Sequence, residues 1–424
     1  MKTVIKNGHV LDPLTNSNEV MDILLVDGTI AKVGKELQEE ADKVIDATGK
    51  YVMPGFIDLH VHLRDPGLEY KETIETGARA AAHGGFTTIC AMPNTKPATD
   101  CAEVVSYIVE KAKKLELVNV LPIGAITVGQ DGVELADFAA MKEAGICAIS
   151  EDGKSVMSTD LYMEAMKQAA ALGLPVLAHC EDRPLVRGGV MNAGKKAEEF
   201  GLKGITNAVE DVIVARDILM AKEAGCQLHL CHCSTADSVR LVKLGKEMGV
   251  ALSAEVCPHH FAMTDEEITR NHGDFKMNPP LRGKKDVEAL ITGLSDGTME
   301  AIATDHAPHG WEENNQTMDK APFGIVGLET AFALTMTKLV VPGKITPMQM
   351  VERLSTAPAK ILGLNKGGIK EGMDADLVIA DLEKQTVIDR TTFFSKGRNT
   401  PFDQMPVIGE VVTTICNGKV VYSK

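Results

Sequence analysis

Two histidines stand two residues apart at the end of an apolar segment. His60 and His62 belong to the stretch Asp58-Leu59-His60-Val61-His62. Side chains alternate along a β-strand, so the two imidazoles would point to the same side. A pair of imidazoles on one face suits zinc, which binds histidine nitrogen in tetrahedral sites. Two core histidines with internal hydrogen bonds are the alternative, but the spacing at a strand end favours a metal site.

Four further apolar segments also end in carboxylates or imidazoles. They end at Glu151-Asp152-Gly153, at His179, at His232 and at Thr304-Asp305-His306. A mononuclear catalytic zinc typically takes three protein ligands, whereas two metals share a bridging carboxylate and a bridging hydroxide. We therefore predict a binuclear metal centre with six ligands, namely His60, His62 and one carboxylate or imidazole from each of the four other segments.

The elements that carry these residues alternate between strand and helix. Eight apolar strand candidates cover residues 56–62, 87–94, 118–127, 147–152, 175–181, 227–234, 251–259 and 299–308. Helical periodicity follows them, as over residues 73–83, 135–144, 161–172 and 207–224, and glycines such as Gly145, Gly173, Gly225 and Gly249 stand where the helices would end. Eight such units predict an α/β fold, a TIM-like (β/α)8 barrel with its active site at the carboxyl ends of the strands. The rival, a doubly wound open sheet, lacks a glycine-rich phosphate fingerprint after the first strand.

The two ends of the chain differ from the middle. Residues 3–11 and 414–422 each contain an Asn-Gly pair between apolar residues, which predicts a β-hairpin in each segment. Further short strands are expected at 22–26, 30–33, 51–53 and 376–380. This pattern predicts one small β-sandwich domain formed from both termini. We expect it to contain residues 1–53 and 365–424, with the metal-binding barrel over residues 54–364.

The composition excludes several classes of protein. The net charge of −15 argues against a nucleic-acid partner. The nine cysteines lack the dense spacing of a secreted disulfide scaffold. No apolar run has the length of a membrane span, and the first residues lack a signal-peptide core. We therefore expect a cytoplasmic protein without a membrane partner.

Two motifs resemble one family closely. The segment from Asp58 to Gly67 (DLHVHLRDPG) and the segment from Ala303 to His309 (ATDHAPH) are similar to the signatures of dihydroorotases of the bacterial long-chain type, within the amidohydrolase superfamily. The resemblance extends over essentially the whole chain. It implies two zinc ions per subunit: His60, His62 and Asp305 hold one, His179 and His232 hold the other, and Asp152 and a hydroxide bridge them. Many relatives bridge their metals with a carboxylated lysine; Lys154 is the lysine available for that role, but we favour Asp152.

The resemblance also implies the reaction. It is the reversible, zinc-dependent hydrolysis of (S)-dihydroorotate to N-carbamoyl-L-aspartate, the third step of de novo pyrimidine (UMP) biosynthesis. Asp305 would be the catalytic base and then the acid. Arg64 can supply the fork of donors that the substrate carboxylate needs. The further substrate contacts implied are Asn94, Asn278, His309, Phe323 and Gly324, although Asn94 and Asn278 alone would be interpreted as turn residues.

Other interpretations remain open from the sequence. Residues 310–322 form a polar loop that is either a lid over the substrate or an ordinary surface loop. His259 and His260 are expected to be structural, and Cys180 and Cys257 to pack in the core. An allantoinase or hydantoinase is the alternative enzyme, and an inactive dihydroorotase-like scaffold for aspartate transcarbamoylase is the alternative outside enzymes. We also expect a homodimer, with aspartate transcarbamoylase as a candidate partner.

Overall fold

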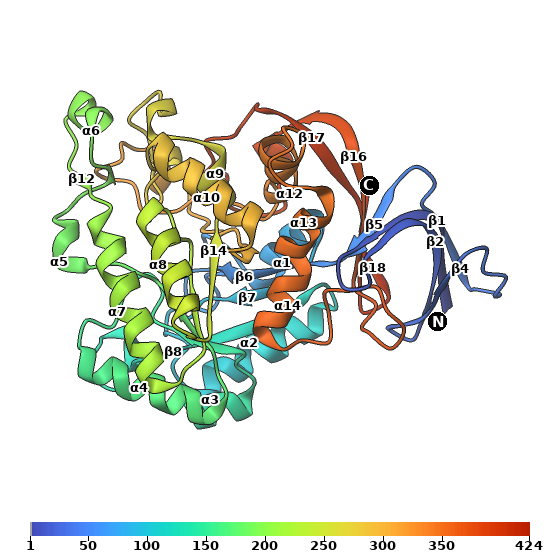
Figure 1. Ribbon diagram of the computed structural model, residues 1–424, viewed down its shortest axis with the longest axis horizontal. Coiled ribbons are helices and arrows are strands. Elements are labelled where there is room, and N and C mark those ends of the chain that lie inside the picture. The colour runs from blue at the N-terminus through green and yellow to red at the C-terminus, as the bar shows by residue number, and fades with distance from the viewer. Residues whose placement is uncertain (1) are drawn as a thin grey trace.

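The computed structural model describes residues 2–424, which form a barrel and an adjoining β-sheet that contains both chain ends (Figure 1). The barrel is built from eight parallel strands in the order β15-β14-β13-β10-β9-β8-β7-β6. A bridge between Val61 and His306, with the His62 N–H donating to the His306 carbonyl at 2.9 Å, joins the first strand region to the last. The strands are β6 (Phe56–Val61), β7 (Phe86–Ala91), β8 (Asn119–Ala125), β9 (Ala148–Ser150), β10 (Val176–Ala178), β13 (Leu228–Leu230), β14 (Leu252–Val256) and β15 (Ala301–Ile302).

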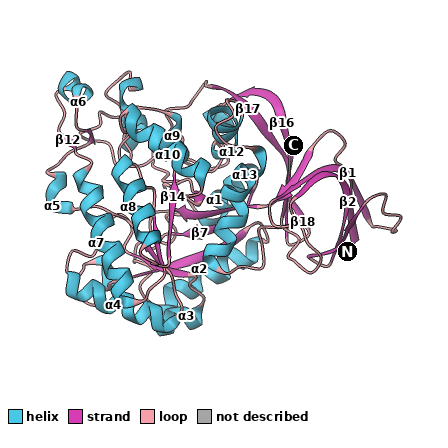
Figure 2. Cartoon of the chain, viewed as in Figure 1, coloured by secondary structure: helices cyan, strands magenta, loops and turns pink. Residues whose placement is uncertain are grey.

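Helices surround the barrel strands (Figure 2). Gly145, Gly173 and Gly225 end three of them in the left-handed conformation that glycine adopts without steric cost. Each of the eight predicted strands overlaps an observed strand, and each predicted helix overlaps an observed one. The main helices are α1 (Ile74–His83), α2 (Ala102–Leu115), α3 (Phe138–Ala144), α4 (Thr159–Leu172), α7 (Ala208–Ala224), α8 (Ala236–Glu247), α10 (Lys284–Asp296), α12 (Ala331–Thr335), α13 (Pro347–Val351) and α14 (Ala357–Leu362).

The second sheet combines strands from the two ends of the chain. Its order is β18-β17-β16-β5-β1-β2-β3, and β4 pairs with β1. The strands are β1 (Lys2–Asp12), β2 (Ser17–Val26), β3 (Thr29–Gly34), β4 (Lys43–Asp46), β5 (Tyr51–Pro54), β16 (Leu377–Val387), β17 (Pro406–Cys416) and β18 (Lys419–Ser423). One apolar cluster joins both ends of the chain, because Ile5 and Ile23 share it with Leu377 and Ile415. The domain limits at residues 54 and 364 stay predictions.

Two local predictions from the sequence were wrong. Residues 3–11 are not a hairpin: β1 is continuous, and the register with β2 shifts between Ile5 and Gly8. Asn7 has a φ of 59°, so the Asn-Gly pair forms a bulge in one strand. The equivalent pair Asn417-Gly418 does connect two strands, β17 and β18, as predicted.

The strand predicted over residues 251–259 ends earlier than expected. β14 stops at Val256, and α9 (Pro258–Ala262) begins with proline in its first turn. Proline suits the first turn because the N–H groups there have no partner within the helix. His259 and His260 therefore lie on a short helix and not on a strand. Among residues 2–424, no helix is long and apolar enough to cross a membrane.

Candidate active site

The six predicted metal ligands lie together at one end of the barrel. Parallel strands place their carboxyl ends at one rim, and the six residues come from β6 or from the segments that follow β6, β9, β10, β13 and β15. Every one of them is at most 6% exposed. The Asp152 carboxylate lies within 3.7 Å of four imidazole nitrogens, at 3.2 Å from His60, 3.5 Å from His62, 3.5 Å from His179 and 3.7 Å from His232.

The donors divide into two groups on either side of Asp152. Asp305 Oδ1 lies 3.0 Å from His62 Nε2 and 3.5 Å from His60 Nε2. On the other side, His179 Nδ1 lies 2.8 Å from His232 Nε2. His60 Nε2 is buried and has no hydrogen-bond partner within residues 2–424. Four imidazoles and two carboxylates, with an unpartnered nitrogen directed at the carboxylates, fit the ligand chemistry of zinc and similar divalent metals.

The charges of the donor groups are balanced by protons that a metal ion could displace. Burial alone would raise the pKa of Asp152, but the charge of His60 and the hydrogen bonds from His179 and His232 hold that pKa well below its usual value. Burial opposes protonation of His179, yet its contacts with Asp152 and Glu181 raise its pKa to about 10. The carboxylates are therefore ionised, and protons on His60 and His179, whose pKa values are raised, balance their charge. A divalent cation would take over that role and release the protons.

Neighbouring side chains orient two of the imidazoles. Asn94 Oδ1 lies 2.8 Å from His62 Nδ1, and Glu255 Oε1 lies 3.2 Å from His60 Nδ1. In both histidines this leaves Nε2 to face the carboxylates. Asn94, expected to contact substrate, thus contacts a predicted metal ligand in this structure. Lys154 Nζ donates to the Gln130 carbonyl at 2.7 Å, so it is directed to the backbone and away from the imidazoles.

A cavity of about 230 Å³ opens onto this centre. Its volume is on the scale of a small ring compound, below the usual range of about 300–1,000 Å³ for drug-sized ligands. His60 lies beneath the surface of the cavity and does not line it. The lining brings together the other predicted ligands and every predicted substrate residue: His62, Arg64, Asn94, Asp152, His179, His232, Asn278, Asp305, His309, Phe323 and Gly324, together with Gly153 and Ala307.

Arg64 brings a positive charge into the cavity and forms no direct ion pair with the described residues 2–424. Its side chain is buried, and Nε donates to the Pro308 carbonyl at 3.4 Å. No carboxylate within residues 2–424 lies within the 4 Å that defines an ion pair with its guanidinium. A buried charge is costly unless it is paired. The Arg64 guanidinium is therefore a group in this cavity with which an anionic ligand could pair.

The other predicted substrate residues already have protein partners. His309 Nε2 lies 2.8 Å from the Phe323 carbonyl, and Lys71 Nζ lies 3.2 Å from His309 Nδ1. The Gly324 N–H donates to the Lys276 carbonyl at 2.9 Å. Asn278 Nδ2 donates to the Glu181 carboxylate. Burial and the charges of Arg64 and Lys71 hold the pKa of His309 well below its usual value, so this imidazole is neutral.

The polar segment 310–322 lies over the same end of the barrel. It begins with α11 (Trp311–Asn314), and the Glu313 carboxylate accepts a hydrogen bond from Tyr70 at 2.7 Å and pairs with Lys71 at 3.1 Å. Lys71 therefore joins this segment to His309. These contacts anchor the segment beside the cavity, and its movement as a lid stays a prediction.

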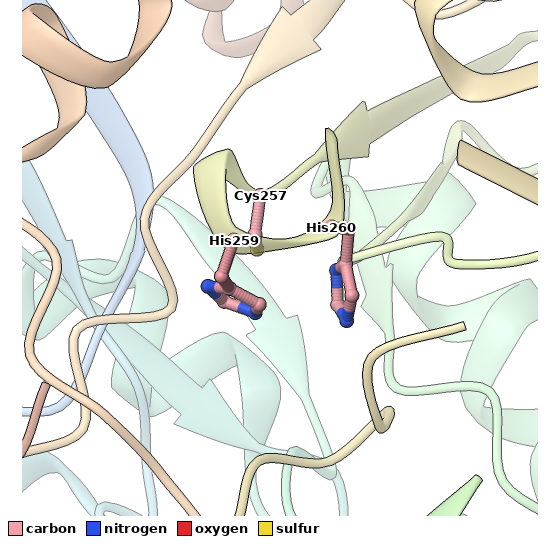
Figure 3. A group of neighbouring side chains, drawn as sticks. All are labelled: Cys257, His259 and His260. Atoms are coloured by element: carbon pink, nitrogen blue, oxygen red, sulfur yellow. The ribbon is translucent and has the colours of Figure 1, made fainter. Parts of the chain in front are cut away.

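A separate group of possible ligands lies on α9 and on the residue that precedes it (Figure 3). Cys257, His259 and His260 extend from the same turn and are buried. Burial lowers the pKa of His260 to about 4, and His260 Nε2 donates to the Pro279 carbonyl at 2.9 Å. None of the three lines the cavity. Their structural role stays a prediction, as does that of Cys180, which is buried beside Asp217.

Sequence reasoning missed several residues that hold the site together. Glu255 and Glu181 contact His60 and His179, and Lys71 contacts His309. Glu255 had a signal, because it is the one charged residue in the apolar run from Ala251 to Cys257. A charged residue inside a buried strand needs a partner. Nothing in the local sequence indicated that Lys71 would reach His309.

Comparison with known proteins assigns the chain to a family. A family model described as "Dihydro-orotase-like" matches residues 49–238. Proteins named dihydroorotase from Bacillus cereus (strain AH820) and Bacillus pumilus (strain SAFR-032) are 49% and 48% identical over 424 residues, covering 100% of this chain and 99% of each relative. Among solved structures, an L-hydantoinase (dihydropyrimidinase) from Arthrobacter aurescens has a TM-score of 0.89 at 29% identity, covering 100% of this chain and 96% of its own. A dihydropyrimidinase from Brevibacillus agri has a TM-score of 0.86 at 25% identity, covering 100% and 95%.

These likenesses agree with the geometry of the site. The barrel, the terminal sheet and the cluster of histidines and aspartates match a metal-dependent hydrolase of cyclic amides, and the relatives cover the whole chain. The chain belongs to the dihydroorotase family.

Proposed function

We propose that this protein hydrolyses the ring amide of (S)-dihydroorotate reversibly to N-carbamoyl-L-aspartate, in the third step of de novo pyrimidine biosynthesis. The observation that carries the proposal is the buried guanidinium of Arg64, which lacks a carboxylate partner among residues 2–424 and shares the cavity with the metal donors. Dihydroorotate has a ring amide for the metal centre and a free carboxylate for Arg64. One small ligand can therefore engage both features.

The metal part of the proposal is two zinc ions. His60, His62 and Asp305 would hold one ion, His179 and His232 the other, and Asp152 would lie between them, as its contacts with all four imidazoles support. When bound, the zinc ions would supply an activated water, whose pKa falls from ~15.7 to ~7, and would polarise the ring carbonyl.

The residues of this chain would bind the substrate and move one proton. Arg64 holds the carboxylate and so orients the ring. The attacking oxygen bonds to the ring carbonyl carbon while the carbon–nitrogen bond breaks. Asp305 takes the proton of the attacking water on a carboxylate oxygen and passes it to the departing ring nitrogen. Burial alone would raise the pKa of Asp305, but His62 and the charge of His60 hold it well below its usual value, so the carboxylate is ionised, which is the form that a base needs.

The likeness to hydantoinase structures supports a second candidate, a hydrolase of uncharged cyclic amides. An uncharged ring has no group to pair with the buried Arg64, and this favours dihydroorotate. An inactive scaffold is disfavoured because all six donors are present and gathered.

The test compares substrates on one preparation of the full chain. Hydrolysis of dihydroorotate, allantoin, hydantoin and dihydrouracil is measured side by side, with metal content determined on the same sample. We expect turnover of dihydroorotate to exceed that of the other three and two zinc ions per chain. Faster turnover of dihydrouracil or hydantoin would favour the second candidate, and a metal-replete chain inactive on all four would favour the scaffold.

The quaternary and cellular assignments are also part of this proposal. We expect a cytoplasmic homodimer, with aspartate transcarbamoylase as a candidate partner. Light scattering of the purified chain, alone and mixed with that enzyme, tests both associations.

A further inference from the structure

Glu255 is a fully buried carboxylate that lies behind the metal donors. It stands in β14, and its exposure is 0%. Oε1 accepts from His60 Nδ1 at 3.2 Å and from the His232 N–H at 3.1 Å, and Oε2 accepts from His229 Nε2 at 2.9 Å. One side chain thus contacts two of the proposed metal ligands, which come from β6 and from the segment after β13.

The contact with His60 selects the nitrogen that faces the centre. Because Nδ1 donates to Glu255, Nε2 is the nitrogen that faces Asp152 at 3.2 Å and Asp305 at 3.5 Å, and a bound metal would take its lone pair after the proton there is released. An imidazole whose far nitrogen is hydrogen-bonded to a carboxylate is fixed in tautomer and ring orientation, and its basicity as a ligand rises.

The contact with His232 holds a strained piece of backbone. His232 has a φ of 35°, in the left-handed region that residues with a Cβ rarely adopt. Its N–H is bound by Glu255, and its Nε2 lies beside His179 and Asp152. The hydrogen bond therefore supports the backbone turn that directs this imidazole into the centre.

A second layer fixes the carboxylate itself. His229 is 0% exposed, and its Nδ1 lies 2.8 Å from Ser253 Oγ. Both oxygens of Glu255 are thereby occupied by buried N–H donors, which leaves the carboxylate little freedom to rotate. Burial alone would raise its pKa, but His229 and His60 lower the pKa to about 2.

We propose that Glu255 is a positioning residue that holds one ligand of each of the two metal sites, with His229 and Ser253 fixing its carboxylate. The inference rests on the metal centre of the proposed function. The positioning role of Glu255 differs from a purely structural role in its expected result. When Glu255 is replaced, metal binding should change by more than the stability of the fold does.

The experiment measures metal binding on the full chain. The variants are Glu255→Gln and Glu255→Asp, and the matched control is Asp376→Asn. Gln keeps an oxygen for His60 and His232, and its amide can donate to His229, whose other nitrogen then donates to Ser253. Asp keeps the charge, but its side chain is one methylene shorter.

The control residue Asp376 is likewise a buried acceptor, bonded to the Asn417 N–H at 2.6 Å and to Lys366 at 2.7 Å, but it lies next to the terminal sheet.

Apo protein is titrated with Zn²⁺ against a chelating indicator and with Co²⁺ by visible absorption, and unfolding is followed in parallel. We expect Zn²⁺ affinity at both sites to fall by about 10–100-fold in Glu255→Gln, with a smaller fall in Glu255→Asp. The Co²⁺ absorption bands should shift in both variants, because they report ligand geometry. Asp376→Asn should bind both metals as the wild type does, whatever its melting temperature.

The outcomes separate this inference from the proposed function. Wild-type metal affinity and Co²⁺ spectra in whichever Glu255 variant folds would overturn the positioning role. A wild-type chain that binds no metal would overturn both proposals. Weakened metal binding in the variants, in a wild type that does not hydrolyse dihydroorotate, would support the positioning role and contradict only the substrate assignment.

Discussion

Replacement of Arg64 by methionine should remove the preference for a substrate with a carboxylate. The substitution keeps an unbranched apolar side chain and removes the charge. In the structure, the guanidinium is buried, and its one hydrogen bond to residues 2–424 runs from Nε to the Pro308 carbonyl at 3.4 Å. It has no acidic partner among these residues. Its remaining donors are therefore available to a ligand.

The size of the effect follows from those free donors. Two hydrogen bonds between a charged donor and a charged acceptor contribute about 1.5–3 kcal/mol each, which gives about 3–6 kcal/mol for a bidentate pair. At 1.36 kcal/mol for each factor of ten, kcat/KM for dihydroorotate should fall by roughly 10²–10⁴-fold in Arg64→Met. Dihydrouracil, the same ring without the carboxylate, has no such pair to lose, so its kcat/KM should change by less than about tenfold.

The assay compares both substrates on wild type and variant at equal metal content. Calorimetry adds a readout that does not depend on turnover: Arg64→Met should weaken binding of N-carbamoyl-L-aspartate and leave that of N-carbamoyl-β-alanine, which lacks the α-carboxylate, nearly unchanged. Arg183→Met, on the short helix α5 (Arg183–Val186), is the control and should match the wild type. Equal losses for both substrates in Arg64→Met would refute the assignment of Arg64 to the carboxylate.

Three further predictions concern the centre and the fold. Asp305→Asn should lower kcat by ~10²–10⁴-fold without loss of fold, because it removes the proton acceptor, and wild-type rates would remove Asp305 from the mechanism. Lys154→Met should keep both metals and full activity, because Lys154 Nζ binds the Gln130 carbonyl, and loss of a metal equivalent by mass spectrometry would show that Lys154 is a ligand. Burial lowers the pKa of His260 from 6.5 to about 4, so the unfolded chain binds this proton more readily; the free energy of unfolding should therefore fall by up to ~3 kcal/mol as the pH drops from about 6.5 to about 4, and level off below. Urea unfolding of His260→Gln should lack that part of the acid slope, and an unchanged slope would contradict the native pKa.

The barrel could be predicted because its signals are local and repeated. An apolar strand followed by helical periodicity recurs eight times, and glycine stands at the end of several of the helices. The same periodicity placed His60 and His62 on one side of a strand, and their nitrogens do meet at Asp305. Prediction failed where one pattern has two local outcomes. The Asn7-Gly8 pair forms a bulge and the Asn417-Gly418 pair a turn, because the neighbouring strand β2 pairs with both halves of β1.

Residue types and their order along the chain determined the candidate ligands, the eightfold alternation and the family, because those depend on the sequence of side chains at strand ends. Tertiary structure alone decided which groups orient them. Glu255 lies 195 residues from His60 in the chain, and Arg64 lies 244 residues from Pro308, yet both pairs are in contact. Contacts of this kind depend on how strands and loops that are distant in sequence close around a common axis. A local sequence pattern does not show which distant residues come into contact. The contact of Glu255 with His60 and the absence of an ion pair at Arg64 therefore became known only from the fold.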